Sequence, residues 1–217
     1  MSPLLLLLLP LLAAAAPAEL TADRVVARVQ KLYDGTKDFT AAFEQEYEMS
    51  ALGRSQKSRG RVAFQKPGRI RFDYVEPTPK TFAVDGTTLW VYQPADNQAL
   101  VDRCFRADGL TASLVFLGGT GRIAELFNLE SAPGDAQHHV VRLVPKAPQG
   151  AYRSITLWVD RATFEVRRSV VEDPNGNPNR FAFADVRRNK GVKPEQVLFT
   201  PAATVAVDAV PGSCVQR

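Results

Sequence analysis

The sequence predicts a mainly β protein, in which about eleven short antiparallel strands form one sheet that curls into a barrel or a half-barrel. In the stretch from Arg59 to Tyr92, runs of β-branched and aromatic residues alternate with turns that contain proline and glycine. A second series of such runs begins at His138. With 217 residues, 45% of them hydrophobic, the chain is long enough for one domain with a sizeable core. A β-sandwich fits the same pattern and is an open alternative.

The first residues, 1–18, are expected to be a secretory signal peptide. A leucine-rich run is followed by small residues that end in Ala16-Pro17-Ala18, which is typical of a cleavage site. The run is short for a membrane span. No cysteine follows the small residues, so we expect a soluble exported protein whose single domain covers residues 19–217.

An amphipathic helix is expected over Thr21 to Asp34, because its apolar residues recur at helical spacing. Thr21 suits the N-cap, and Gly35 suits the stop. The run from Phe39 to Tyr47 alternates between apolar and polar residues and predicts a strand. The helix needs an apolar surface to pack on.

The central strands carry a clear β pattern. Ile70, Phe72 and Tyr74 alternate with charged residues, so one face of the sheet is apolar and the other is wet. In the strand from Thr87 to Tyr92 both faces carry bulky apolar side chains, which suggests that a helix or a ligand covers the second face. A further strand is expected over Gln98 to Arg103.

The pattern changes between Leu110 and Leu129, where Gly118, Gly119 and Gly121 interrupt an apolar segment. This favours two short helices on a glycine hinge. One interpretation is a movable lid, because lids pivot on a few permissive residues. The other is an ordinary helical hairpin in the core.

After this segment the chain returns to strands, separated by turn residues. They are expected at His139–Val144, Tyr152–Val159, Thr163–Glu172, Arg180–Val186 and Val197–Thr200.

The charge of the chain argues against nucleic acid as a partner. The chain has 27 Lys and Arg against 23 Asp and Glu, a formal net charge of +4 that is spread along the sequence. A nucleic-acid binder concentrates its cations in a patch.

The two cysteines, Cys104 and Cys214, leave two alternatives open. In an exported protein they are compatible with one disulfide that pins the C-terminal tail. Spacing alone does not show proximity, so two separate thiols fit equally well.

The sequence has no recognisable catalytic or metal-binding pattern. His138 and His139 are adjacent, so a strand would point them to opposite faces and they would not chelate one metal together. Zinc spacing, a nucleophile elbow and a phosphate-binding glycine loop are lacking. Glu44 and Glu46 share a strand face, which a solvated edge explains. We therefore expect no enzyme, no metal and no cofactor.

A carrier of hydrophobic ligands fits the pattern better than an enzyme does. The inner wall of its cavity is expected to come from Phe39, Phe43, Ile70, Phe72, Phe82 and Trp90, and its lid from Leu114, Phe116 and Leu117. The alternative is that these side chains only fill a core against the N-terminal helix.

Five segments carry a resemblance to a known family. They are Phe39-Thr40-Ala41-Ala42-Phe43-Glu44-Gln45, Gly60-Arg61-Val62, Lys66-Pro67-Gly68-Arg69-Ile70-Arg71-Phe72-Asp73-Tyr74, Asp85-Gly86-Thr87-Thr88-Leu89-Trp90-Val91-Tyr92 and Phe199-Thr200-Pro201. In this order they resemble the LolA family of periplasmic lipoprotein carriers, over most of the chain that follows the signal peptide.

The resemblance implies an incomplete, half-open antiparallel β-barrel with a helical lid over its concave apolar face. It also implies a monomeric periplasmic chaperone. This carrier would take acylated lipoproteins from an inner-membrane ABC transporter and deliver them to an outer-membrane lipoprotein receptor. The alternative function is a periplasmic sensor or carrier with the same fold that acts on another lipid.

One residue departs from the family pattern. Members usually have arginine before the Pro-Gly turn, where the resemblance implies a latch that holds backbone carbonyls of the lid; this chain has Lys66. A lysine keeps the charge, but it lacks the planar fork that grips two acceptors. We expect Lys66 to be a weaker latch with the same role.

Overall fold

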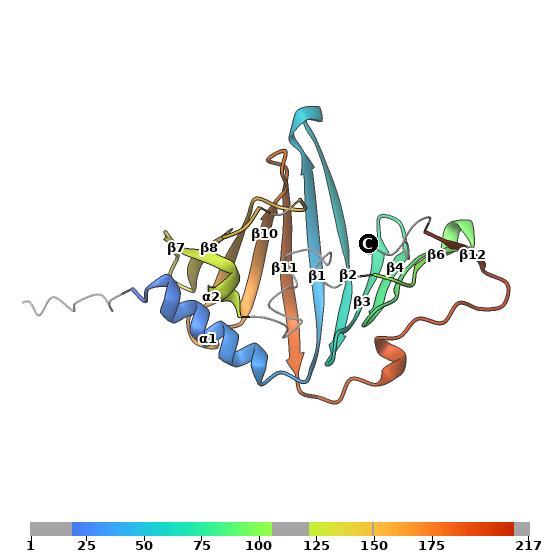
Figure 1. The fold of residues 1–217 in the computed structure, drawn as a ribbon, viewed down its shortest axis with the longest axis horizontal. Helices are drawn as coiled ribbons and strands as arrows, with labels where there is room; N and C mark the ends of the chain where they lie inside the picture. The colour runs from blue at the N-terminus through green and yellow to red at the C-terminus, as the bar shows by residue number, and fades with distance from the viewer. Residues whose placement is uncertain (1–18, 106–121, 149, 211–217) are drawn as a thin grey trace, which may run out of the picture.

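The computed structural model describes residues 19–105, 122–148 and 150–210, and these form one twelve-stranded sheet with two helices (Figure 1). The helices are α1 (Ala22–Asp34) and α2 (Ile123–Leu126). The strands are β1 (Asp38–Met49), β2 (Arg54–Gln65), β3 (Arg69–Glu76), β4 (Lys80–Asp85), β5 (Leu89–Gln93), β6 (Gln98–Asp102), β7 (Phe127–Ala132), β8 (His138–Pro145), β9 (Ser154–Asp160), β10 (Val166–Glu172), β11 (Pro178–Arg188) and β12 (Ala206–Ala209). Nowhere in these ranges is a helix long and apolar enough to cross a membrane.

The sheet joins two antiparallel meanders at its centre. β1 pairs with β2 on one side and with β11 on the other, so the early strands β1–β6 continue into the later strands β11–β7. Beyond β6, β12 runs parallel to it. Within the described residues, β7 and β12 are the two edges of the sheet and do not pair with each other. The predicted half-open barrel is therefore confirmed.

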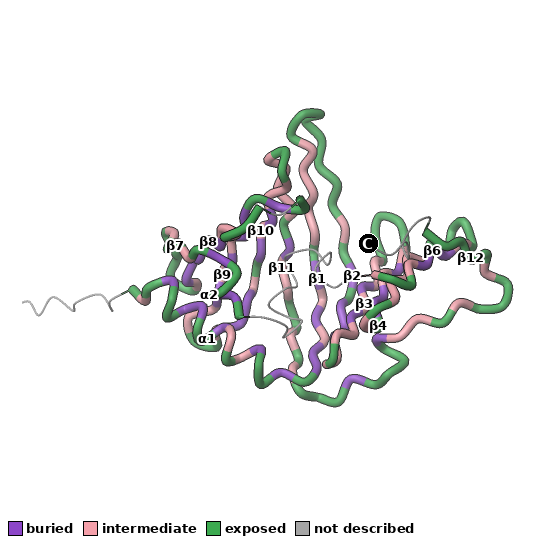
Figure 2. Tube along the Cα trace, in the orientation of Figure 1, coloured by how far each residue is buried: buried purple, intermediate pink, exposed green. Residues whose placement is uncertain are grey.

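α1 confirms the predicted N-terminal helix. The Thr21 hydroxyl accepts a hydrogen bond from the backbone N–H of Arg24 at 3.5 Å, and the helix ends at Asp34 before Gly35. The apolar face of α1 is buried against the sheet (Figure 2). Its contacts are with β7, β8 and α2, so α1 covers the half of the sheet that the later strands build.

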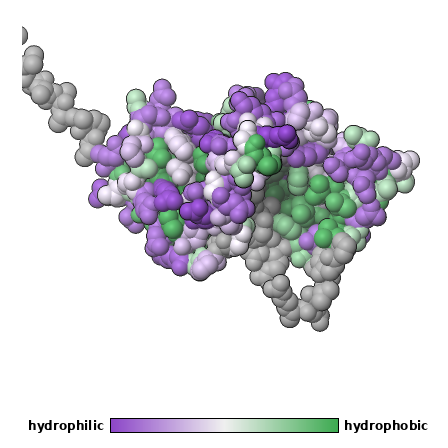
Figure 3. All heavy atoms as spheres, turned by 90° about the horizontal axis from the view of Figure 1, so that it is seen from above, coloured by the Kyte–Doolittle hydropathy of each residue, from purple (hydrophilic) through white to green (hydrophobic). Residues whose placement is uncertain are grey.

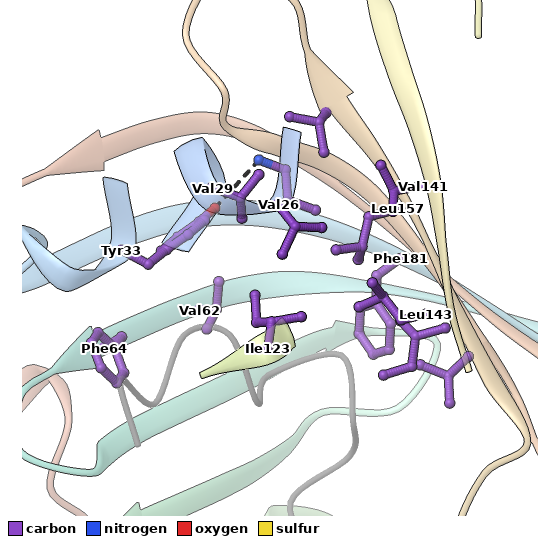
Figure 4. Close-up of a cluster of buried hydrophobic side chains, with 14 of the residues drawn as sticks. Val26, Val29, Tyr33, Val62, Phe64, Ile123, Val141, Leu143, Leu157 and Phe181 are labelled. Atoms are coloured by element: carbon purple, nitrogen blue, oxygen red, sulfur yellow. Dashed lines mark hydrogen bonds between the residues drawn. The ribbon is translucent and has the colours of Figure 1, made fainter. Parts of the chain in front are cut away.

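The core lies on one face of the sheet, which we call the inner face; it carries Phe43, and the opposite, outer face carries Glu44. Residues that pair directly across two strands share a face, so the pairing carries this reference from strand to strand even where a bulge breaks the alternation. Val29 of α1, Ile123 of α2 and Leu157 of β9 belong to one buried cluster on the inner face (Figure 4).

Residues 197–200 were expected to be a strand, and this prediction is wrong. The segment follows a short 3₁₀ helix, Pro194–Gln196, and crosses the outer face instead of pairing at an edge. Arg71 Nη1 donates a hydrogen bond to the Leu198 carbonyl at 2.9 Å, and the Phe199 ring lies 5.7 Å from the Trp90 ring and 5.2 Å from the Tyr92 ring. The segment thus covers apolar side chains on the outer face, where a helix or ligand was expected.

The predicted helices between Leu110 and Leu129 fall only partly within the residues that the structure describes. Residues 106–121 lie outside the described residues. α2 is a helix, but Phe127–Leu129 belong to β7, which pairs with β8, so the helical prediction is wrong there. Pairing satisfies the backbone N–H and C=O groups that the edge of β8 would otherwise leave unpaired.

Candidate functional site

A cavity of about 270 Å³ lies on the inner face, on the half of the sheet that α1 does not cover. It is lined by Gln45, Ile70, Phe72, Tyr74, Lys80, Phe82, Val84, Leu89, Asn179 and Phe181. Hydrophobic residues gather around a hollow on the side of the molecule that carries β2–β6 (Figure 3). The cavity is therefore the candidate site for an apolar ligand.

Strand register brings the apolar lining residues together. Ile70 of β3 pairs with Val84 of β4, which pairs with Leu89 of β5, so these three form one apolar row across the sheet. Phe72 pairs with Phe82 in the next row on the same face. Each row therefore adds bulky side chains to one wall of the cavity.

Gly60 makes room for the aromatic side chains of the wall. It pairs with both Phe43 and Tyr74, whose rings meet edge to face with centroids 5.0 Å apart. A Cβ atom at Gly60 would lie 2.1 Å from the Asp73 carbonyl oxygen and 2.9 Å from the Phe43 ring. A larger residue at this position would push the rings and the β3 backbone apart.

The predicted wall residues divide into three groups. Ile70, Phe72 and Phe82 line the cavity. Phe43 is on the inner face but fully packed, with its ring 5.3 Å from the Phe72 ring. Phe39 is buried against Phe64, away from the cavity.

The placement of Trp90 on the inner wall is wrong. Trp90 pairs with Ala83 and follows Leu89, so it points to the face opposite Phe82 and Leu89. On that outer face it packs against Phe199. Both faces of β5 are apolar, and the pattern alone does not say which face looks inward.

Several lining residues were not named in advance. Tyr74, Val84 and Leu89 share the alternation of Ile70 and Phe72 and were within reach of the same reasoning. Phe181 arrives from β11, far along the chain, and only the pairing of β1 with β11 brings it to the cavity. The predicted lid residues Leu114, Phe116 and Leu117 lie outside the described residues.

Lys66 connects the turn between β2 and β3 to the end of α1. Its Nζ donates to the Tyr33 carbonyl at 2.8 Å and to the Asp34 carbonyl at 3.1 Å. The last carbonyls of a helix have no partner within the helix, and they form the negative end of its dipole. The ammonium group therefore donates hydrogen bonds to two carbonyl oxygens and also interacts favourably with the negative end of the helix dipole.

Two tyrosines at the inner face, Tyr33 of α1 and Tyr74 of β3, have a raised pKa. Burial raises the pKa of Tyr33 to about 12, although its hydroxyl accepts a hydrogen bond from the Val166 N–H at 3.3 Å. Burial also raises the pKa of Tyr74 to about 12. Neither phenol adds charge to the inner face at neutral pH.

Two of the larger hollows on the outer face are lined by several charged side chains each. One, of about 510 Å³, includes Lys57, Arg59, Glu76, Arg168 and Arg180 in its lining. The other, of about 540 Å³, is lined largely by charged residues, among them Arg61, Asp73, Asp185, Arg187 and Glu195. A third, of about 420 Å³, includes Glu44, Arg59 and Arg61 in its lining. Hydrocarbon would strip water from these charges, which disfavours an apolar ligand in each of the three hollows.

The cysteines and histidines give the site no further chemistry. Cys104, which follows β6, is disulfide-bonded, while Cys214 lies outside the described residues, so the pairing of the two stays a prediction. The described residues hold no group of three or more His, Cys, Asp and Glu side chains arranged for a metal ion.

The family model for "Outer membrane lipoprotein carrier protein LolA" matches residues 34–200 of this chain. The chain belongs to the LolA family. A LolA-family relative from Chromobacterium violaceum, named outer-membrane lipoprotein carrier protein, is 27% identical over 200 residues, which cover 91% of each chain. One of the same name from Methylococcus capsulatus is 28% identical over 205 residues, 93% of this chain and 95% of the relative.

Solved structures share the fold of this LolA-family chain. An uncharacterized conserved protein from Thermus thermophilus matches with a TM-score of 0.56 and 13% identity, over 87% of this chain and 99% of the other. A chain of the Pseudomonas aeruginosa MucA/MucB complex matches with a TM-score of 0.52 and 16% identity, over 87% of this chain and 64% of the other.

Proposed function

We propose that this protein is a periplasmic chaperone that binds the acyl chains of lipoproteins and carries them to the outer membrane. The observation that carries the proposal is the apolar cavity on the inner face, in a LolA-family chain with relatives named as lipoprotein carriers. The cargo would come from an inner-membrane ABC transporter and go to an outer-membrane lipoprotein receptor. No chemical step is needed.

The physical task is to keep hydrocarbon away from water. Each buried methylene is worth about 0.8 kcal/mol, so a lipoprotein with two or three chains does not leave a membrane unaided. A carrier replaces the membrane with its own apolar wall. Delivery then runs downhill when the receptor binds the chains more tightly than the carrier does.

Lys66 is the proposed latch of this carrier. It ties the C-terminus of α1 to the β2–β3 turn, and α1 is the described helix that covers part of the inner face. Breaking these two hydrogen bonds would loosen the last turn of α1 from the β2–β3 turn, while Val25, Val26 and Val29 stay buried against the sheet. A lysine, which is not a planar fork, makes this release easier than an arginine would.

The test is to purify the protein from a periplasmic extract and to identify what co-purifies by intact and lipid mass spectrometry. We expect acylated lipoprotein with the wild-type chain. Leu89→Glu places a carboxylate in the cavity and should abolish co-purification, whereas Val75→Glu places one at an exposed position of β3 that does not line the cavity and should not.

Other outcomes would contradict the proposal. Free phospholipid in place of lipoprotein would favour the alternative, a sensor or carrier of another lipid. A protein that is empty and also fails to take lipoprotein from detergent would contradict any carrier function.

A further inference from the structure

One cation, Lys80, projects into the otherwise apolar side of the cavity. Lys80 is the first residue of β4, pairs with Tyr74 of β3 and shares the inner face with Phe82. Its Nζ lies 4.4 Å from the centroid of the Tyr74 ring and 5.3 Å from that of the Phe82 ring. The ammonium group therefore rests on two aromatic rings of the cavity wall.

Lys80 has no anionic partner in the part of the chain that the structure describes. Neither a carboxylate nor a hydrogen-bond acceptor is paired with its Nζ there; its contacts are the two rings. Burial lowers the pKa of Lys80, because removal of water disfavours the charged form. Ring contacts of this kind replace lost hydration only in part. An oxygen acceptor would complete the site.

The opposite wall of the cavity offers a second polar group. Gln45 of β1 donates a hydrogen bond from Nε2 to Asn179 Oδ1 of β11 at 2.9 Å. Both side chains line the same cavity as Lys80. In the described residues the Asn179 amide nitrogen makes no hydrogen bond, so its two N–H groups are free to donate.

Strand register makes the cavity polar at one end and apolar at the other. The row of Tyr74 and Lys80 is followed by the row of Phe72 and Phe82 and then by the row of Ile70, Val84 and Leu89. The first and last rows are four residues apart along β3, which is roughly 13 Å at 3.3 Å per residue. The cavity thus has the polarity of an acyl group with its head oxygen at one end.

We propose that the cavity binds acyl groups in one direction, with an oxygen of the ester, amide or carboxylate head held by Lys80 and the hydrocarbon directed toward Ile70, Val84 and Leu89. The inference rests on the proposed function and adds an anchor to it. Two sources supply this chemistry, the acylated cysteine of a lipoprotein and a free fatty acid.

The test compares ligands that share a chain and differ in the head group. The protein is first loaded with a neutral fluorescent probe, 1-N-phenylnaphthylamine. Displacement of the probe then measures the affinities of palmitate, of hexadecyltrimethylammonium and of a triacylated cysteinyl peptide. For Lys80→Met we expect at least a tenfold fall in the affinity ratio of palmitate to hexadecyltrimethylammonium, because a charge-assisted hydrogen bond is lost.

The control is Lys57→Met, which removes an exposed lysine from β2 and should leave this ratio within about twofold of wild type. Circular dichroism and a melting curve verify that each variant is folded, and Lys80→Gln replaces Lys80→Met if that variant is not. A triacylated peptide that is also weakened supports the anchor with lipoprotein as its ligand. Weakening of palmitate alone supports the anchor with a fatty acid as its ligand.

An unchanged affinity ratio in Lys80→Met and Lys80→Gln would overturn the anchor and leave the proposed carrier function standing. Failure of the wild-type protein to bind the neutral probe and any of the three ligands would instead overturn the proposed function, and the anchor with it.

Discussion

The two halves of the inner face are built from similar side chains but are filled differently. Where α1 lies across the sheet, the gap between Tyr33, Phe39 and Val166 is about 20 Å³. On the other half, a cavity of about 270 Å³ remains between Phe72, Phe82 and their neighbours. The difference comes from the covering element, since the period-2 alternation is the same in both halves. The packed half stabilises the fold, and the open half is available to a ligand.

The largest expected effect is on the packed half. Leu157 of β9 is 0% exposed, so Leu157→Ala leaves a cavity that α1 and the sheet do not close. We expect a loss of about 2–5 kcal/mol in the free energy of unfolding, measured by urea denaturation. Ligand affinity measured under conditions where the variant is folded should stay within about twofold. A loss below about 1 kcal/mol would contradict the division into a packed and an open half.

The burial of Tyr33 in the packed half can be tested through the pH dependence of the free energy of unfolding. Its pKa is raised by burial to about 12 in the folded state from an ordinary value of 10.0. A pKa that is raised in the folded state contributes stability that is fully present below the pKa of the unfolded state. This stability is lost as the pH rises through the pKa of the folded state. Between pH 10 and 12 the loss should be on the order of 2 kcal/mol. Tyr33→Phe should lower stability at neutral pH but flatten this alkaline decline; an equally steep decline would contradict the assignment.

Leu89→Ala is the matched change on the open half. Leu89 is only half-buried and lines the cavity, so shortening it removes ligand contacts and few core contacts. We expect affinity for the neutral probe to fall about tenfold, from the loss of two to three buried carbon groups. The free energy of unfolding should change by less than about 1 kcal/mol. A large loss of stability with unchanged affinity would contradict the account, because Leu89 would then belong to the stabilising core and not to the ligand site.

Lys66→Met tests the connection between the two halves, and its expected effect on stability is small. It removes two charge-assisted hydrogen bonds to the end of α1, at a partly exposed position, for a cost of about 1 kcal/mol. Hydrogen exchange at the last turn of α1 and the rate of probe exchange should both increase. Lys31→Met removes a cation from the same helix terminus without breaking the link and is the control. Equal effects of the two variants would contradict the link and would mean that Lys66 acts only through the helix dipole.

Local sequence patterns anticipated much of this fold. The caps of α1 and the alternation of Ile70, Phe72 and Tyr74 are properties of short segments, and each leads directly to an observed element. β12 was not anticipated, because its four exposed residues have no apolar pattern and depend on pairing with β6.

The site was less accessible to sequence reasoning than the fold, because it depends on which face of each strand looks inward. β5 is apolar on both faces, so Trp90 was placed on the wrong one; its real partner, Phe199, comes from a segment about a hundred residues later that was expected to be a strand. Lys80 follows two prolines in a turn and has no local signal of a site. Only the pairing of β4 with β3 places it over the cavity rings.

The most direct test of the central claim is photo-crosslinking with p-benzoylphenylalanine at two aromatic positions. Phe82 and Trp90 lie on neighbouring strands and face opposite sides of the sheet. With a triacylated lipoprotein supplied in detergent, the probe at Phe82 should crosslink to the acyl chains and the probe at Trp90 should not. Crosslinking from Trp90 alone, or equal crosslinking from both positions, would contradict the assignment of the acyl site to the open half of the inner face.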